Sequence, residues 1–237
     1  MRNGPVEDWG DYVRRSLERD RRLAAEPGGN LADASGLADA PRPSEVVRVL
    51  VGAGVRHALI GAHAVGMRTG APRYTKDVYF IVDDVDAAAK ALAAAFPRLR
   101  EESLGGGAGR TLVDARGREV VDLLNTKRMG RSIAIPDAEP VVVDGVEVRV
   151  PTAEGLVALK YVAIRSVGPD GTPGRPMKKR MYDLGDILSL MESAPAFDAN
   201  KVYGLLCGAF DADFAERWRR DADTLASGKV IDLGLDG

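Results

Sequence analysis

The stretch from residue 59 to residue 82, LIGAHAVGMRTGAPRYTKDVYFIV, decides the fold. It contains a short apolar run that ends at Gly61-Ala62, a predicted helical turn, a polar and basic segment, and a second apolar run that begins with Asp77. Because side chains alternate along a strand, positions 77 and 79 share one face of the second run. A carboxylate at the start of a buried strand must be solvated at the mouth of a cleft, paired with a cation or bound to a metal.

The composition is that of a globular chain. With 237 residues, 45% of them hydrophobic, the chain can bury a core and form one large domain or two small ones. Its formal net charge of -2 indicates no particular partner but leaves room for a local basic face. The single cysteine, Cys207, excludes an internal disulfide and is expected to pack in the core. No apolar targeting segment opens the sequence, so we expect a cytoplasmic protein without membrane contact.

The N-terminal part is predicted to be a helix that docks on the body through Trp9, followed by a linker. Apolar residues recur at helical spacing between residues 6 and 25, which predicts an amphipathic helix. Its arginines could face RNA or an acidic partner, although a solvated helix face is the more common role. A segment rich in Gly, Ala, Asp and Pro at 26–43 predicts a linker, and Ser44 is expected to cap a helix over 45–53.

Hydrophobic periodicity predicts alternating strands and helices after residue 56. The expected elements are a strand at 57–60, a helix at 62–68, a strand at 77–82, a helix at 85–96 capped by Asp83-Asp84, and strands at 110–114 and 119–124. The glycine run 105–109 is expected to be a turn, because no Gly-Lys-Ser/Thr follows it. Asp144-Gly145 predicts a hairpin over 140–150, and helices are expected at 153–167, 177–191, 200–210 and 212–225.

Asp122 is a candidate site residue because it is embedded in the apolar strand EVVDLL, residues 119–124. An unpaired carboxylate in such a setting would cost several kcal/mol or take up a proton. Two explanations remain open for Asp122 taken alone: it binds a metal, or it pairs with an arginine such as Arg73 or Arg118.

Residues 59–82 resemble the DNA polymerase beta-like nucleotidyltransferase superfamily, whose members carry a strand, a glycine-containing turn into a helix, and Asp-x-Asp on the next strand. GAHAV at 61–65 and RYTKDV at 73–78 resemble its AbiEii-like branch, the nucleotidyltransferase toxins of bacterial type IV toxin-antitoxin systems. Such enzymes hold Mg²⁺ on paired aspartates and transfer a nucleotide from an NTP. This sequence departs from the pattern at two positions. Ala62 replaces a Gly or Ser, and Tyr79 replaces the second aspartate.

A second part of the sequence is similar to the same branch. LVALK at 156–160 is followed by a loop and by KKRMYDLGDILSL at 178–190, as in AbiEii-like proteins. The resemblance implies that Lys160 contacts the NTP phosphates and that Asp183 helps to hold the catalytic arrangement. The alternative for these residues is an ion pair that joins two packed helices, and Asp186 fits that role equally well.

The resemblance covers about residues 43–192 and implies an α/β fold. We expect a small mixed, twisted sheet built from strands near residues 57, 77, 110 and 119, flanked by helices and followed by a helical C-terminal part. The expected division is an N-terminal helix and linker (1–42), a nucleotidyltransferase-like core (43–151) and a helical region (152–237).

The implied reaction is transfer of a nucleoside monophosphate from an NTP, with Mg²⁺, to a tRNA end or a protein hydroxyl. The implied context is a toxin with a cognate antitoxin. Asp77 and Asp122 are the expected metal ligands and, with Lys160 and Asp183, the expected catalytic residues. The residues expected to contact the nucleotide are Gly61, Ala62, Arg73, Lys76 and Lys160.

Tyr79 bears directly on that mechanism, because a neutral, bulky phenol is a poor Mg²⁺ ligand. With Asp77 and Asp122 alone, we expect one weakly held ion. Three interpretations stay open: a degenerate fold that binds nucleotide or a partner without turnover, an active enzyme that recruits another carboxylate such as Asp183, or an inactivating lesion. A different class is a non-enzymatic module whose basic residues 178–180 bind an acidic antitoxin or RNA.

Overall fold

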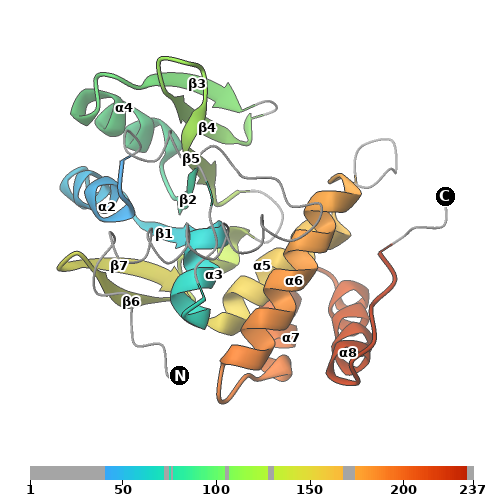
Figure 1. Ribbon diagram of the computed structural model, residues 1–237. Helices are drawn as coiled ribbons and strands as arrows, with labels where there is room; N and C mark the ends of the chain where they lie inside the picture. The colour runs from blue at the N-terminus through green and yellow to red at the C-terminus, as the bar shows by residue number, and fades with distance from the viewer. Residues whose placement is uncertain are drawn as a thin grey trace, which may run out of the picture.

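The computed structural model describes residues 41–71, 75, 77–104, 107–127, 131–167 and 174–233 (Figure 1). The predicted N-terminal helix and nearly all of the linker lie outside these ranges, as do Arg73 and Lys76. The division of the chain at residues 42 and 151 stays a prediction.

The described chain is an α/β structure, as predicted. In chain order its elements are α2 (Pro43–Gly52), β1 (His57–Ile60), α3 (Gly61–Thr69), β2 (Val78–Val82), α4 (Val85–Ala95), β3 (Arg100–Leu104), β4 (Gly109–Val113), β5 (Glu119–Asn125), the 3₁₀ helix η3 (Arg131–Ile133), β6 (Ala138–Val143), β7 (Val146–Pro151), α5 (Ala153–Arg165), α6 (Met177–Ser193), α7 (Ala199–Cys207) and α8 (Ala212–Ala226).

A five-stranded mixed sheet in the order β1-β2-β5-β4-β3 forms the centre of the fold. Only the central pair, β2 and β5, is parallel; the other neighbours run antiparallel. The predicted mixed sheet is therefore confirmed, with β3 as an additional edge strand. The sequence does not predict β3, because its residues, REESL, are mostly polar. In the structure they are mostly exposed. Charged residues on an edge strand disfavour pairing with another chain.

Helices cover the sheet and extend away from it. Helix α4 packs on β3, β4 and β5, while α3 packs on β1 and joins α5 and α6. Helices α7 and α8 pack together at the end of the molecule away from the sheet, and α7 also packs on α5 (Figure 1). One continuous apolar cluster runs from Val46 to Leu233, so the C-terminal helices share a core with the sheet.

Local sequence signals explain most element boundaries. Asp84 caps α4 by accepting a hydrogen bond from the backbone N–H of Ala87, and Thr152 caps α5. The predicted hairpin is confirmed as β6 and β7: Asp144 and Gly145 have φ angles of 48° and 71°, as a two-residue turn of this kind requires.

Two local predictions were wrong. Helix α2 begins at Pro43, whose fixed φ suits the first helical position, and its N-cap is Arg42 rather than Ser44. The Ser44 hydroxyl instead donates a hydrogen bond of 3.0 Å to Asp144 of the hairpin turn. Cys207 is exposed, because the apolar face of α7 is formed by Val202 and Leu206.

Asp137 joins the sheet part of the molecule to the C-terminal helices. Its Oδ2 accepts hydrogen bonds from the Thr152 backbone N–H (2.9 Å) and hydroxyl (2.8 Å), just before α5 begins. Its Oδ1 lies 3.4 Å from Nζ of Lys201 on α7. A Cβ atom on Gly155 would lie 1.9 Å from Asp137 Oδ2, so any larger residue at that position would displace this carboxylate. The start of α5 is thus fixed by one carboxylate.

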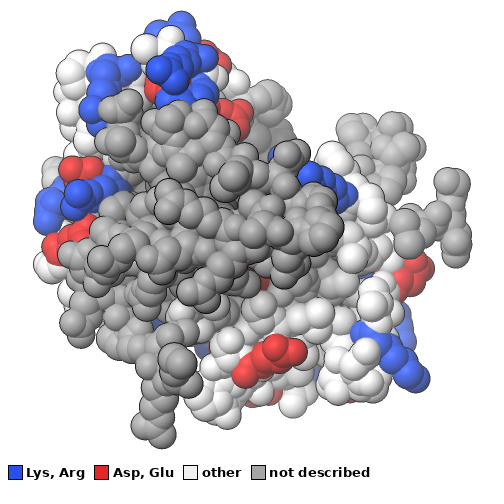
Figure 2. Space-filling model, in the orientation of Figure 1, with Lys and Arg blue, Asp and Glu red and all other residues white. Residues whose placement is uncertain are grey.

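Surface charge is mixed on the face shown in Figure 2. The Lys and Arg side chains of the described residues form separate groups there, and Asp and Glu side chains lie among them. This pattern agrees with the formal net charge of -2. No helix in the described ranges is both long and apolar enough to cross a membrane.

Candidate functional site

The parallel pairing of β2 and β5 brings the two predicted metal ligands together. Asp77 directly precedes β2, and the register places Tyr79 opposite Asp122 on β5. Asp77 shares the face of Tyr79, so its carboxylate and that of Asp122 lie on one side of the sheet. Carboxylate oxygens of Asp77, Asp122 and a third residue, Glu119, all lie within 4.8 Å of one another. We call these three residues the acidic cluster.

Asp122 is the most buried member of the acidic cluster. The residue is 4% exposed, and its Oδ1 has no hydrogen-bond partner among the residues that the structure describes. Burial raises the pKa of its carboxyl group to about 6. Arg118, one of the two arginines considered as a partner, binds Asp114 instead, with Nε 2.7 Å from Oδ2. The other, Arg73, lies outside the described residues.

Glu119 is a site residue that sequence analysis missed. Regular alternation along β5 would place residues 119 and 122 on opposite faces of the sheet. The pairing of β4 with β5 is irregular, however: Leu112 pairs with Val121 and Val113 pairs with Glu119. The extra residue, Val120, is a β-bulge that turns Glu119 toward Asp122. No sequence signal marks this bulge.

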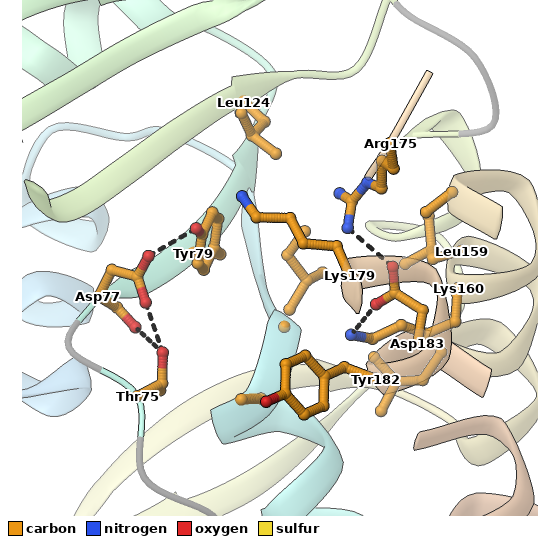
Figure 3. Close-up of a pocket in the computed structure, with 15 residues that line it drawn as sticks. Thr75, Asp77, Tyr79, Leu124, Leu159, Lys160, Arg175, Lys179, Tyr182 and Asp183 are labelled. Carbon is orange, nitrogen blue, oxygen red and sulfur yellow. Dashed lines mark hydrogen bonds and ion pairs between the residues drawn. The ribbon is translucent and has the colours of Figure 1, made fainter. Parts of the chain in front are cut away.

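Tyr79 occupies the position of the missing aspartate and binds Asp77. Its hydroxyl donates a hydrogen bond of 2.5 Å to Asp77 Oδ2, and the Thr75 hydroxyl donates to Oδ1 (Figure 3). Burial and the nearby Asp77 carboxylate both raise the pKa of the Tyr79 phenol, which therefore remains protonated. The ring packs on the start of α3, where a Cβ atom on Gly61 would lie 3.1 Å from Tyr79 Cδ2. Gly61 also has a φ of 76°, which favours glycine.

Helices α5 and α6 carry a second charged group opposite the sheet. Nζ of Lys160 lies 2.7 Å from Asp183 Oδ1 and 2.7 Å from Asp186 Oδ2. Arg175 binds the other oxygen of Asp183 at 2.8 Å. The Asp183 and Asp186 side chains are 4% and 8% exposed, so these charges are largely removed from water. We call these four residues the paired cluster. Asp183 is thus held by cations of its own and is not a member of the acidic cluster.

A cavity of about 320 Å³ separates the two clusters. Asp77 and Tyr79 line one side; Lys160, Arg175 and Asp183 line the other. Gly61 and Ala62 also line it, as do Lys179 and Tyr182 of α6. Lys179 extends from α6 toward Tyr79, and Tyr182 presents its ring to the same space (Figure 3). Of the acidic cluster, Asp77 lines this cavity, whereas three cationic side chains and Asp183 line the helix side.

The acidic cluster fits a divalent cation. Carboxylate oxygens are the donors that Mg²⁺ and Mn²⁺ prefer. A buried carboxylate oxygen without a hydrogen bond is expected to find a cation or a water molecule. Asp77 and Asp122 would hold the ion, and Glu119 lies within reach of both.

No protein-family model matches the sequence, and no curated protein matches it. Among solved structures, the chain is similar to an antigenic nucleotidyltransferase-like protein from Paracoccidioides brasiliensis, with 18% identity, a TM-score of 0.47 and coverage of 81% of this chain and 94% of that one. It is also similar to ANT(2″)-Ia in complex with adenylyl-2″-tobramycin (18% identity, TM-score 0.48, 73% of this chain and 94% of that one). A third similar structure is the Megavirus polyadenylate synthase (12% identity, TM-score 0.49, 84% of this chain and 43% of that one). We derive the function of the cavity from its own residues.

Proposed function

We propose that this chain transfers a nucleoside monophosphate from an NTP to a hydroxyl group, with a divalent cation held by Asp77 and Asp122. The hydroxyl oxygen loses its proton and attacks the α-phosphorus, and pyrophosphate leaves. One observation carries the proposal: a single cavity has Asp77, a member of the acidic cluster, on one side and Lys160, Lys179 and Arg175 on the other. A triphosphate needs positive charge on both sides, from a metal ion and from basic side chains. The cavity offers both within a space of about 320 Å³.

The residues of the cavity have separate roles in this reaction. When bound, a divalent cation neutralises the triphosphate and lowers the pKa of the attacking hydroxyl. Lys179 extends into the cavity and supplies a point charge for the phosphates. Lys160 does the same from α5, while Asp183 and Asp186 fix the position of its ammonium group.

The nucleotide also needs contacts away from its phosphates. Gly61 and Ala62 open α3, whose N-terminal backbone N–H groups favour phosphate oxygens. Tyr182 is 54% exposed and lines the cavity, and an aromatic ring in this position can stack on a base. The resemblance of 73–78 to AbiEii-like proteins supports further contacts from Arg73 and Lys76.

The acceptor and the biological role rest on the same resemblance. Segments 59–82 and 156–190 resemble AbiEii-like toxins, which supports transfer with Mg²⁺ to a tRNA end or a protein hydroxyl. It also supports a toxin role that a cognate antitoxin would neutralise. Growth arrest of a bacterial host on induced expression is the expected result, and loss of arrest in Asp77→Asn/Asp122→Asn is the matched control.

A second candidate is a nucleotide-binding or partner-binding module without turnover. The observation that favours it is the hydrogen bond from Tyr79 to Asp77, which occupies one oxygen of a predicted metal ligand. Under this interpretation, NTP binds the helix side of the cavity but is not cleaved.

Labelled NTPs test the two candidates. Each of the four NTPs, labelled at the α-phosphate, is incubated with tRNA or total protein and Mg²⁺ or Mn²⁺. We expect transfer by the natural chain, and more transfer by Tyr79→Asp, which restores a carboxylate opposite Asp122. Lys179→Ala should reduce transfer, whereas Lys90→Ala, which changes an exposed lysine of α4 away from the cavity, should not. NTP binding without transfer by any of these proteins would favour the second candidate.

A further inference from the structure

The acidic cluster contains a carboxylate that the nucleotidyltransferase pattern does not include. The pattern expects two aspartates on one strand, and here the second of them is Tyr79. Glu119 comes from the neighbouring strand β5, yet its carboxylate lies within 4.8 Å of those of Asp77 and Asp122. The arrangement depends on the bulge at Val120, which places Glu119 and Asp122 on one face although they are three residues apart.

We propose that Glu119 replaces the carboxylate lost at position 79, so that Asp77, Glu119 and Asp122 together bind one divalent cation. The inference rests on the proposed function in that it concerns the same cavity. It goes beyond that function because it assigns Glu119 of β5 as a metal ligand in place of the carboxylate expected at position 79 of β2.

Close carboxylates alone do not make a metal site, because exposed acidic groups often cluster without an ion. Here a second observation points to a ligand. Oδ1 of Asp122 belongs to a side chain that is almost fully buried, and within the described ranges it accepts no hydrogen bond of normal geometry, although the Thr111 and Tyr79 hydroxyls lie near the carboxyl group. Leaving such an oxygen without a partner destabilises the folded state, and the cost is larger for a charged group. No ion pair between described residues involves any of the three carboxylates, so the chain's described part supplies no cation there.

Tyr79 then acts as a positioning residue for Asp77. Its hydroxyl holds Oδ2, and Thr75 holds Oδ1, which fixes the plane of the Asp77 carboxylate. Hydrogen bonds to ligating carboxylates are a normal part of the surroundings of a metal site. Because three protein oxygens leave about three of the six positions of Mg²⁺ or Mn²⁺ open, the phosphate oxygens of an NTP would have room to bind.

Titration of the full chain with Mn²⁺ in the absence of NTP tests the proposal. Free Mn²⁺ is followed by its electron paramagnetic resonance signal in four proteins: the natural chain, Glu119→Gln, Tyr79→Phe and Glu147→Gln. Glu147 is an exposed glutamate on β7 and provides the matched control. We expect one bound ion in the natural chain and unchanged affinity in Glu147→Gln. Glu119→Gln should bind roughly tenfold or more weakly, since even partners outside the ligand shell alter metal affinity by 10- to 100-fold. Tyr79→Phe should still bind the ion, because its phenol is not a ligand.

Equal Mn²⁺ affinity in Glu119→Gln and the natural chain would overturn the proposal, as would the absence of any bound Mn²⁺. Circular dichroism and thermal unfolding of Glu119→Gln show whether the variant folds, and its exposed position makes loss of folding unexpected. The result is separable from the proposed function. Mn²⁺ binding that depends on Glu119 without any nucleotidyl transfer refutes the proposed function and leaves the ligand assignment standing. Transfer by a chain whose Mn²⁺ affinity does not depend on Glu119 refutes the ligand assignment alone.

Discussion

The two clusters beside the cavity differ in whether cations lie next to their buried carboxylates. In the paired cluster, Lys160 and Arg175 compensate Asp183 and Asp186 through contacts of 2.7 to 2.8 Å. In the acidic cluster, three carboxylates lie within 4.8 Å of one another, and Oδ1 of Asp122 has no hydrogen-bond partner in the described part of the chain. Within the described ranges, the paired cluster contains its own cations, whereas the acidic cluster contains none.

This difference has consequences for the stability of the folded chain. Removing one partner from a buried ion pair is strongly destabilising, because it leaves an uncompensated charge. Removing a carboxylate from a group that lacks cations has the opposite effect, because it relieves burial and repulsion. The two clusters should therefore respond with opposite signs to the loss of a charge, and the following experiments test that contrast.

The largest effect is expected for Lys160→Met, which removes the cation shared by Asp183 and Asp186. We expect the free energy of unfolding to fall by about 3–5 kcal/mol. Urea denaturation near pH 7.5 measures the change. As a control, the variant that also carries Asp183→Asn and Asp186→Asn should recover most of the loss. A fall of less than about 1 kcal/mol would mean that other groups compensate these carboxylates.

A pH dependence is expected from Asp122, whose pKa is raised from 3.8 to about 6 by burial. The folded state binds the Asp122 proton more tightly than the unfolded state does. Below about pH 4 the carboxyl group is protonated in both states, so it does not lower the free energy of unfolding. The penalty from its ionisation grows as the pH rises to about 6 and then reaches about 3 kcal/mol. The free energy of unfolding of the metal-free chain, measured from pH 3.5 to 8 relative to Asp122→Asn, should show this decline. In the same window, Mn²⁺ affinity should increase with pH. A flat difference would contradict the burial of a charged Asp122.

Asp122→Asn is expected to stabilise the metal-free protein by about 1–3 kcal/mol at pH 8, because it removes the buried charge but retains the shape of the side chain. Urea denaturation with a chelator measures this gain, and Glu147→Gln, on an exposed part of β7, should leave stability within about 0.5 kcal/mol of the natural chain. Added Mn²⁺ should reverse the order of stability. Destabilisation of the metal-free variant would show that Asp122 is already compensated.

The smallest effect is expected for Tyr79→Phe, which removes one of the hydrogen bonds to Asp77. Thr75 still donates to the other oxygen, so the free energy of unfolding should fall by only about 1 kcal/mol. Tyr203→Phe is a matched control away from the cavity, because the Tyr203 hydroxyl also binds a carboxylate, that of Glu216, at 2.8 Å. A loss above about 3 kcal/mol for Tyr79→Phe alone would show that the phenol does more than orient Asp77.

The sequence predicts the fold well where the signals are local. The apolar runs of β1, β2 and β5, the Asp144-Gly145 turn and the Asp84 and Thr152 caps each have a direct physical cause, and the structure has them in those places. The sequence does not predict strand β3, because REESL has no alternation of apolar and polar residues. The strand forms through its pairing with β4. The start of α2 was displaced because Ser44 bonds to Asp144, 100 residues away in sequence.

The residues of the candidate site also fall into two groups, those that local sequence signals predict and those that depend on tertiary packing. The proximity of Asp77 to Asp122 follows from the strand pattern, because both lie on central strands of one sheet. Glu119 could not be found from the sequence, since the bulge that turns it is a property of the pairing between β4 and β5. The contact of Lys160 with both Asp183 and Asp186 could not be predicted from the sequence alone, because it depends on how α5 packs on α6.

The carboxylate of Asp137 fixes one end of helix α5, so a small rotation of the helix moves the residues farther along it by a larger distance. The helix is held at its first residues by that side chain, and Lys160 lies eight residues beyond Thr152, about 12 Å along the axis. A rotation of α5 by about 5° around this fixed end would move the Lys160 Cα by about 1 Å, a displacement that can change a reaction rate by about 100-fold. Substitutions at Asp137, Gly155 or Lys201 should therefore alter the width of the cavity without touching it. Under the proposed function, the distance between a phosphate and Lys160 would depend on contacts at the opposite end of the helix.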